Sequence, residues 1–352
     1  MAKAAALIND LEEVCAHLEP FRHALEGRSI FLAGCTGFIG RWLLDALHWA
    51  SEAHGYDLHL TALTRSRDML LRRAPELAGR NGLTLVEGSF PNLPENAIPP
   101  FDLAVHGVTL HEGGTPDWPA QLCSTLCRGT ENFMRLAQKR GCRRVLYLSS
   151  GAVYGCPALG QGFPIMEEDA TLRQRLCQSS LYGESKRFVK LMLTALGQSC
   201  SIGVTVARCF AFCGRHLSMN RANALPSILQ DAIAGREIVL TGDGSAQRSF
   251  LYGTDMAVHL LACLVRGDDG VAYNVGSAKV VTIRELAEII AQLAGGRSKV
   301  RVLGQPNHGN APSRYVPDTR RIQEELGVRE TVELDEGLRR TLLWARACIR
   351  LA

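Results

Sequence analysis

A strand-like apolar segment, residues 29–33, runs directly into the turn Gly34-Cys35-Thr36-Gly37-Phe38-Ile39-Gly40, and a helical pattern begins at residue 39. Glycine at three spaced positions lets the backbone turn tightly and lets a ligand approach it closely. The start of the following helix offers free N–H groups and the positive end of the helix dipole, which suits a pyrophosphate. An ordinary tight turn would not need all three glycines. The turn therefore predicts a dinucleotide site, with Gly34, Gly37, Phe38, Ile39 and Gly40 at the cofactor.

Beyond this turn, short apolar strands alternate with longer helical stretches. The expected strands cover residues 29–33, 58–63, 83–87, 103–106, 145–149 and 203–208, and the expected helices cover residues 39–52, 120–140 and 182–196. Alternation of this kind is typical of an α/β fold with a doubly wound parallel sheet of the Rossmann type.

The pattern changes on both sides of this region. Before the first strand, Leu7, Leu11 and Val14 stand at helical spacing, so residues 1–27 are expected to form a helical extension used for packing or for a dimer surface. Residues 28–210 are expected to form the dinucleotide-binding domain with the catalytic residues. After residue 210, a polar stretch and short elements predict a smaller C-terminal substrate-binding lobe, residues 211–352, which is interleaved with the sheet domain.

The composition argues against several other classes of partner. The net charge of +4 is spread along the chain without a clustered basic face, so no nucleic-acid partner is expected. No apolar run approaches the roughly 20 residues of a membrane span, so no membrane partner is expected either. The 12 cysteines are scattered and form no Cys-x-x-Cys pair, which predicts no metal site and a reducing, cytoplasmic compartment.

Tyr182 and Lys186 stand four residues apart in a predicted helix, so their side chains share one face. A tyrosine hydroxyl has a pKa of about 10, but a neighbouring ammonium group and a positive nicotinamide ring favour the phenolate, which can take a proton from a substrate hydroxyl. By itself the pair fits a core tyrosine with a solvated lysine equally well. Ser150 favours the catalytic interpretation, because it follows the strand at residues 145–149, whose carboxyl end is where ligands lie in such sheets.

Together these motifs resemble the extended short-chain dehydrogenase/reductase family, the nucleotide-sugar epimerases and dehydratases. The shared patterns are Gly-x-x-Gly-x-x-Gly, Ser-Ser-x-x-Val-Tyr-Gly and Tyr-x-x-x-Lys, and further matches extend over residues 28–328. The resemblance implies that Ser150 is the catalytic hydroxyl, Tyr182 the acid or base and Lys186 the ribose-binding cation. It places Phe210 beside the nicotinamide, and it implies a homodimer joined through the helices at residues 120–140 and 182–196.

The resemblance also suggests how the substrate diphosphate is held. Asn223 begins an Asn-x-x-Pro segment, and Arg248 and Arg314 stand where the family carries phosphate-binding arginines. Arginine suits this role because its planar fork donates two hydrogen bonds to phosphate oxygens. A surface salt bridge stays open as the alternative for both arginines.

Three positions depart from the family pattern at the cofactor. The end of the second strand carries Arg65 in place of the usual acidic residue, and an arginine there can meet a 2′-phosphate, so the cofactor is NAD or NADP. Ser89 replaces the aspartate at the adenine site. His106 opens a His-Gly-Val-Thr sequence where the family has His-Leu-Ala-Ala. All three residues are expected at the cofactor.

The residues after Ser150 help to choose the reaction. Dehydratases of the family carry Asp-Glu there and decarboxylases carry a nearby Glu, whereas this chain has Gly151 and Ala152. Small residues resemble the 4-epimerases and 4-keto-sugar reductases, which favours hydride transfer at C4 of a nucleotide-diphosphate sugar. Two alternatives stay open: a 4,6-dehydratase with displaced acids, for which residues 167–169 are candidates, and a non-catalytic dinucleotide sensor.

Overall fold

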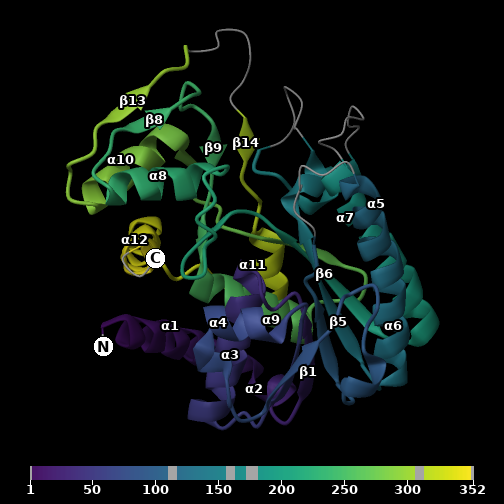
Figure 1. The fold of residues 1–352 in the computed structure, drawn as a ribbon. Helices are drawn as coiled ribbons and strands as arrows, with labels where there is room; N and C mark the ends of the chain where they lie inside the picture. Colours follow the sequence, from purple (N-terminus) through teal and green to yellow (C-terminus); the bar gives the residue numbers. More distant parts are fainter. Residues whose placement is uncertain (1, 110–116, 156–162, 172–180, 306–312, 350–352) are drawn as a thin grey trace.

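The computed structural model describes residues 2–109, 117–155, 163–171, 181–305 and 313–349 (Figure 1). Its centre is a seven-stranded sheet in the order β11-β6-β5-β4-β1-β2-β3, in which every neighbouring pair is parallel. The strands are β1 (Ser29–Ala33), β2 (His59–Thr64), β3 (Leu83–Glu87), β4 (Leu103–His106), β5 (Arg144–Ser150), β6 (Gly203–Cys209) and β11 (Ala272–Val275). The predicted doubly wound parallel sheet is therefore confirmed.

Helices cover both faces of this sheet, which explains why its strands are apolar runs rather than alternating patterns. On β1, Phe31 faces one core cluster, while Ile30 and Leu32 face the other. The Phe31 side is covered by α5 (Trp118–Cys123), the π-helical turn η4 (Ser124–Arg128), α6 (Gly129–Lys139) and α7 (Leu181–Cys200). The other side is covered by α3 (Phe38–His54) and α9 (Gly253–Arg266), and α1 (Ala2–Leu18) packs against these two helices (Figure 1).

The strand order reverses beside β1. Its neighbours are β2 on one side and β4 on the other, and the chain winds away from β1 in both directions. In open parallel sheets the crevice at such a switch point, at the carboxyl ends of the strands, is where ligands bind. The glycine turn after β1 lies at this point.

The N-terminal extension packs on the outside of α3 and α9. It consists of α1, η1 (Glu19–Phe21) and α2 (Arg22–Leu25). Its buried Asp10 accepts a hydrogen bond from the Tyr252 hydroxyl at 3.0 Å and forms ion pairs of 3.0 Å with Arg215 and Arg340. Because Arg340 belongs to the last helix, α12 (Leu334–Ile349), these contacts tie the first helix to the C-terminal part of the chain.

The second half of the chain contributes to both the sheet and a smaller lobe. Strand β11 and α9 return to the central sheet, whereas α8 (Ala224–Ile233), α10 (Ile283–Leu293) and α12 pack together beside it. The short strands of this half pair as β7 (Phe212–Cys213) with β10 (Leu251–Tyr252), as β8 (Ile238–Leu240) with β13 (Val300–Val302), and as β9 (Gln247–Arg248) with β12 (Val281–Thr282) and β14 (Arg314–Tyr315). The proposed boundary at residue 210 stays a prediction.

The remaining elements are short. They are α4 (Arg67–Arg73), η2 (Pro75–Leu77), η3 (Glu95–Ala97), η5 (Gly151–Tyr154), η6 (Glu167–Thr171) and α11 (Arg320–Leu326). Within the described ranges, no helix combines the length and the apolar character that a membrane crossing requires. The same residues hold no group of three or more His, Cys, Asp or Glu side chains arranged for a metal ion.

Candidate active site

Two of the three glycines in the turn after β1 are required by the protein itself. Gly34 has a φ of +100°, and a Cβ atom added there would lie 2.5 Å from the Gly107 carbonyl oxygen. A Cβ atom on Gly40 would lie 2.2 Å from the Gly34 carbonyl oxygen. The turn is thus pressed against the end of β4 on one side and against the first turn of α3 on the other.

Gly37 is different, because nothing in the protein demands glycine there. Its φ is −85°, and an added Cβ would meet only the Gly34 carbonyl oxygen, at an ordinary 3.7 Å. Gly37 directly precedes the first turn of α3, which begins with Phe38 and Ile39 and presents the free N–H groups of a helix start. A glycine without an internal steric reason at this point fits a pyrophosphate lying against the backbone.

Ser150 is the last residue of β5. Its Oγ accepts a hydrogen bond of 3.1 Å from the Ala152 amide and so caps the short helix η5. In the sheet it stands opposite Cys209 of β6. The hydroxyl is therefore held at the carboxyl edge of the sheet by a local turn.

Tyr182 and Lys186 lie in the first two turns of α7, and their side chains do share one face. The Lys186 ammonium is 5.8 Å from the centre of the Tyr182 ring and 5.2 Å from that of Tyr147. Lys186 is only 2% exposed, and its Nζ donates a 2.9 Å hydrogen bond to the Leu148 carbonyl oxygen on β5. The core-tyrosine alternative with a solvated lysine is therefore wrong for Lys186, whose charged end is buried.

Burial shifts the pKa of both Lys186 and Tyr182. Burial lowers the pKa of Lys186 to about 8, so the amine keeps its proton at neutral pH. Burial raises the pKa of Tyr182, while the neighbouring Thr109 and Ser150 hydroxyls lower it. The site thus holds a cation and two hydroxyl donors around the phenol that has to ionise.

Thr109 and Tyr315 were not predicted from the sequence as site residues. The buried Thr109 Oγ1 has no close hydrogen-bond partner among the described residues, yet it lies near enough to Tyr182 to lower the pKa of that phenol. The Tyr315 ring of β14 lies over Gly151, the residue after Ser150. Thr109 could have been predicted, because its hydroxyl stands just after the fourth strand of the sheet. No local sequence pattern indicates that Tyr315 belongs to the site.

The predicted cofactor residues lie in different surroundings. Arg65 is exposed directly after β2, and Ser89 is half-buried after β3. His106 is fully buried, with its Nε2 2.9 Å from the Thr130 hydroxyl and its ring against Phe90, Phe133 and Tyr147. Burial lowers the pKa of His106 to about 3, so it is neutral. Phe210 follows β6 and packs on Tyr154 and Tyr315. Their roles at the cofactor stay predictions.

The predicted substrate residues are more exposed. Asn223 stands before α8 and makes no capping hydrogen bond with its side chain. Arg248 on β9 donates hydrogen bonds of 2.8 Å and 3.1 Å to the carbonyl oxygens of Gln247 and Ser313. Arg314 on β14 is exposed, with its guanidinium 4.8 Å from the centre of the Phe163 ring. The substrate roles of these three residues stay predictions.

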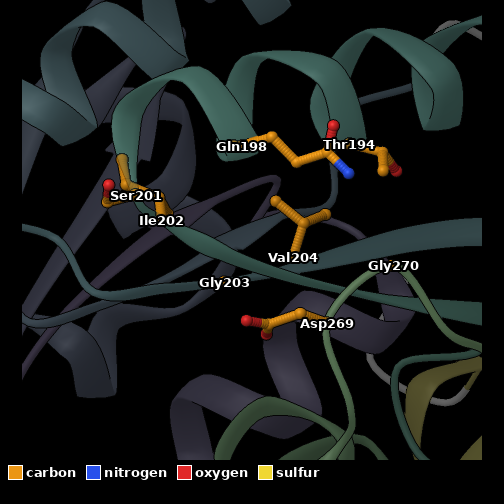
Figure 2. A pocket seen from close by; sticks show the side chains of 9 residues that line it. Thr194, Gln198, Ser201, Ile202, Gly203, Val204, Asp269 and Gly270 are labelled. Atoms are coloured by element: carbon orange, nitrogen blue, oxygen red, sulfur yellow. The ribbon is translucent and has the colours of Figure 1, made fainter.

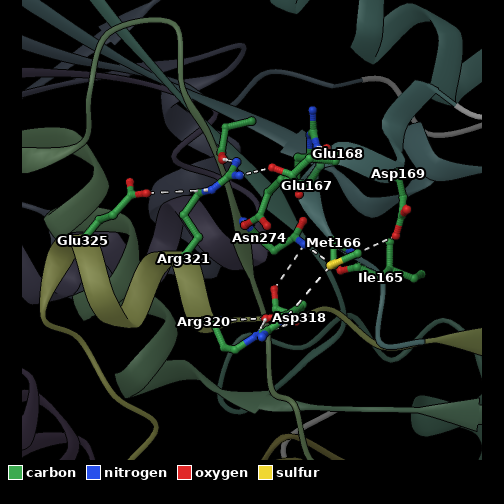
Figure 3. Close-up of polar contacts among 12 residues, drawn as sticks. Ile165, Met166, Glu167, Glu168, Asp169, Asn274, Asp318, Arg320, Arg321 and Glu325 are labelled. Atoms are coloured by element: carbon green, nitrogen blue, oxygen red, sulfur yellow. Dashed lines mark hydrogen bonds and ion pairs between the residues drawn. The ribbon is translucent and has the colours of Figure 1, made fainter. Parts of the chain in front are cut away.

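A buried polar network holds the segments behind the catalytic edge together. The Tyr154 hydroxyl donates to Asn274 Oδ1 at 2.6 Å and accepts from Arg208 at 2.7 Å, which links η5 to β11 and β6. Asn274 Nδ2 donates to the carbonyl oxygens of Ile165 and Asp318, as Figure 3 shows. The network fixes the chain after Ser150, at Tyr154, and after β14, at Asp318.

The three acids proposed as displaced dehydratase groups lie in or beside this network. Glu167 is buried, and its Oε1 accepts a 2.8 Å hydrogen bond from the backbone N–H of Asn274 (Figure 3). Glu168 pairs with Arg321, and Asp169 Oδ2 accepts a 2.8 Å hydrogen bond from the Met166 amide. Each carboxylate therefore has a structural partner already.

A separate pocket of about 350 Å³ lies away from these residues (Figure 2). It is lined by the C-terminal part of α7 with Gln198, by the start of β6, and by Asp269 and Gly270 between α9 and β11. Ser150 and Cys209 stand at the opposite, carboxyl ends of β5 and β6. This pocket is therefore distinct from the candidate active site.

The parallel sheet, the glycine turn at its switch point and the Ser150, Tyr182 and Lys186 group define an enzyme of the short-chain dehydrogenase/reductase class. More specifically, the chain belongs to the NAD dependent epimerase/dehydratase family, whose profile matches residues 30–276. The resemblance found in the sequence is thereby confirmed.

Known relatives carry several nucleotide-sugar activities. UDP-glucuronic acid decarboxylase 1 of Danio rerio is 30% identical over 320 residues, which cover 90% of this chain and 72% of that protein. Among solved structures, a UDP-N-acetylglucosamine 4-epimerase of Methanobrevibacter ruminantium M1 has a TM-score of 0.76 at 20% identity and covers 92% of this chain and 99% of that chain. The UDP-glucose 4-epimerase of Thermotoga maritima has a TM-score of 0.74, also at 20% identity, and covers 91% and 99%. These two likenesses establish the fold alone.

Proposed function

We propose that the protein transfers hydride at C4 of a nucleotide-diphosphate sugar, either as a 4-epimerase or as a 4-keto-sugar reductase. The observation that carries this proposal is the buried Lys186 ammonium beside the Tyr182 ring, with Ser150 at the same strand edge. A bound nicotinamide dinucleotide supplies the two-electron donor and acceptor for this chemistry. Gly37 and the start of α3 are the residues that would hold its pyrophosphate.

In this mechanism the three side chains handle one proton. Tyr182 takes the proton of the C4 hydroxyl when the sugar is oxidised and returns a proton when the keto group is reduced. Ser150 hydrogen-bonds the same oxygen. Lys186 stays protonated at neutral pH and favours the phenolate form of Tyr182 through its charge.

The residues after Ser150 favour C4 hydride transfer over elimination or decarboxylation. Gly151 and Ala152 bring no carboxyl group to the reacting centre. A Cβ atom on Gly151 would lie 2.5 Å from the Tyr315 hydroxyl oxygen, so an acid at residue 151 has no room while Tyr315 is in place.

Decarboxylation is the second candidate function. It is favoured by the Danio rerio decarboxylase and by UDP-N-acetyl-alpha-D-glucosaminuronate decarboxylase of Bacillus cytotoxicus, which is 27% identical over 90% of this chain. Residues 151 and 152 weigh against it. The dehydratase and sensor alternatives keep lower rank, because the candidate acids have structural partners and the Tyr182 and Lys186 pair is intact.

Two finer points complete the proposal. Exposed Arg65, in place of an acidic residue after β2, favours NADP(H), although relatives such as UDP-glucuronic acid 4-epimerase of Bacillus cereus were solved with NAD. A homodimer through α5, α6 and α7 is supported by Phe188 and Leu191 of α7, which are 50% and 63% exposed.

The decisive experiment offers purified protein UDP-glucose, UDP-N-acetylglucosamine, UDP-glucuronic acid and a nucleotide-linked 4-keto sugar, each with NAD(H) and with NADP(H). Inversion at C4 without net cofactor change identifies an epimerase, and loss of NAD(P)H with the keto sugar identifies a reductase. Release of carbon dioxide or of a 4-keto-6-deoxy sugar would replace the proposal by a decarboxylase or dehydratase. Tyr182→Phe should lower kcat by at least about 100-fold. If the Tyr182→Phe protein kept the biological activity of the wild type, the non-catalytic dinucleotide sensor would be favoured.

A further inference from the structure

We infer that Tyr315 is a positioning residue of the catalytic centre, whose hydroxyl orients the Ser150 hydroxyl toward Tyr182, and that Gly151 is glycine to give its ring room. The inference rests on the proposed function for its catalytic meaning. Its geometry is independent of which sugar is bound. Tyr315 belongs to β14, more than a hundred residues after Ser150 and Tyr182 in the chain.

The backbone around Tyr315 is fixed from two sides. Tyr315 pairs with Arg248 of β9 in a parallel ladder. On the other side, the Ile165 amide donates to the Val316 carbonyl oxygen at 3.0 Å, and the Asp318 amide donates to the Ile165 carbonyl oxygen at 2.7 Å. The short strand is therefore held in register beside the catalytic edge.

The ring of Tyr315 is packed between two residues of that edge. Its centre is 4.7 Å from that of the Phe210 ring, just after β6. A Cβ atom on Gly151 would lie 2.5 Å from the Tyr315 oxygen, 2.8 Å from its Cζ and 3.0 Å from its Cε2. The ring thus lies directly over Gly151, and its hydroxyl lies beside the residue that follows Ser150.

The hydrogen-bonding capacity of a serine hydroxyl then determines where its proton points. Ser150 Oγ can accept two hydrogen bonds and donate one. It accepts one from the Ala152 amide at 3.1 Å. Burial raises the pKa of Tyr315 above its ordinary value, so its phenol keeps its proton and can fill the second acceptor position. The Ser150 proton is left for the Tyr182 oxygen or the substrate oxygen beside it.

Several groups face Tyr182 and have to be held constant in a test of this inference. The charged and titratable ones are Lys186 on its own helix, Tyr147 on β5, Cys209 on β6 and Tyr315 on β14. The Ser150 and Thr109 hydroxyls complete the set. Replacing Tyr315 by phenylalanine keeps the ring, removes only its hydroxyl and leaves the other groups in place.

The first arm of the test measures ionisation of Tyr182 without any substrate. The tyrosinate absorbance of Tyr182 is obtained as the difference between a protein and its Tyr182→Phe variant over a pH titration. In the Tyr315→Phe background we expect the Tyr182 midpoint to rise by about one pH unit, because Ser150 no longer has a fixed orientation. Tyr56→Phe is the matched control, since the Tyr56 hydroxyl is buried with no hydrogen-bond partner in the described ranges. An unshifted midpoint in Tyr315→Phe would overturn the inference.

The second arm measures turnover with the substrate found above. Tyr315→Phe should lower kcat about ten-fold and move the acidic limb of the oxidation profile to higher pH, with KM changed less than about two-fold. A purely structural role of the hydroxyl would leave that limb unmoved, which would also overturn the inference. If the wild-type protein converts no nucleotide sugar, the proposed function fails, and the substrate-free titration still decides the role of Tyr315.

The third arm tests the placement of the ring by thermal unfolding. Gly151→Ala should lower Tm in the wild-type background, and the same change should lower it far less in a Tyr315→Ala background, where the space is open. Additive effects of the two changes would show that the ring does not lie over Gly151.

Discussion

The predicted cofactor half and the predicted substrate half of the candidate site are built in different ways. In the cofactor half, Gly34, Gly40 and Gly107 bring backbone segments into direct contact at the switch point of one continuous sheet. In the substrate half, Asn223, Arg248 and Arg314 stand on a helix start and on two-residue strands of the smaller lobe. The first half is set by backbone packing, and the second by side chains that reach into solvent.

This difference indicates where each half tolerates change. A close-packed backbone turn leaves no free space, so an added methyl group forces the main chain to move. Half-exposed side chains on short elements can be replaced with little effect on stability, because they bury little surface and keep few obligatory hydrogen bonds. Substitutions in the cofactor half should therefore change the stability of the protein, and substitutions in the substrate half should change its affinity for the substrate.

The largest effect is expected for Gly40→Ala. The new methyl group would collide with the Gly34 carbonyl oxygen, so the free energy of unfolding should fall by about 3 kcal/mol and dinucleotide binding should be lost. Gly37→Ala is the matched variant, because its Cβ has room: stability should stay within about 1 kcal/mol, while the dinucleotide Kd rises at least about ten-fold. Denaturant unfolding measures the free energy of unfolding, and dinucleotide titration measures the Kd. Equal destabilisation by the two variants would refute the distinction between the glycines.

Lys186→Met tests the effect of the buried Lys186 charge on stability and turnover. The folded pKa of about 8 lies below the 10.5 of a free lysine, so the buried ammonium opposes folding at neutral pH, and stability rises between pH 8 and 10.5 as the folded chain loses its proton first. Removing the charge should therefore raise the free energy of unfolding at pH 7 by about 2 kcal/mol and remove this rise, while abolishing turnover. Denaturant unfolding at pH 7 and pH 10 is the measurement. A variant less stable than wild type at pH 7 would contradict the expectation.

Arg248→Ala moves the test to the substrate half. Arg248 stands half-buried on β9, and the planar fork of its guanidinium suits a diphosphate. KM for the nucleotide sugar should rise about ten-fold, and the free energy of unfolding should change by less than about 1 kcal/mol. Steady-state kinetics beside thermal unfolding separate the two effects. A large loss of stability with unchanged KM would make Arg248 a structural residue.

Asn223→Ala should have the smallest effect on stability. Asn223 holds the N-cap position of α8 without a side-chain cap, so its removal should change unfolding by less than about 0.5 kcal/mol while raising KM about three-fold. Ser66→Ala is the control, since the Ser66 hydroxyl caps α4 by accepting from the Met69 amide, and its loss should reduce stability by about 1 kcal/mol. If Asn223→Ala were as destabilising as the control, its predicted substrate role would lose its support.

Much of the cofactor half could be predicted because its signals are local. The glycine spacing, the strand before it and the helix after it are contiguous, and Tyr182 and Lys186 share a face through helix geometry alone. The substrate half was assigned by resemblance only. The joining of β11 to the central sheet and the tie from Asp10 to Arg340 were not predicted, because neither follows from a local pattern.

The sequence by itself determined the fold class, the position of the dinucleotide turn and the Ser150, Tyr182 and Lys186 group, since regular spacing carries each of them. Only the tertiary structure decided which other hydroxyls surround Tyr182. Thr109 lies just after β4 and Tyr315 on β14, and residues so far apart in sequence meet at one edge only through the order in which strands pair. That order depends on packing across the whole core, which no short segment encodes.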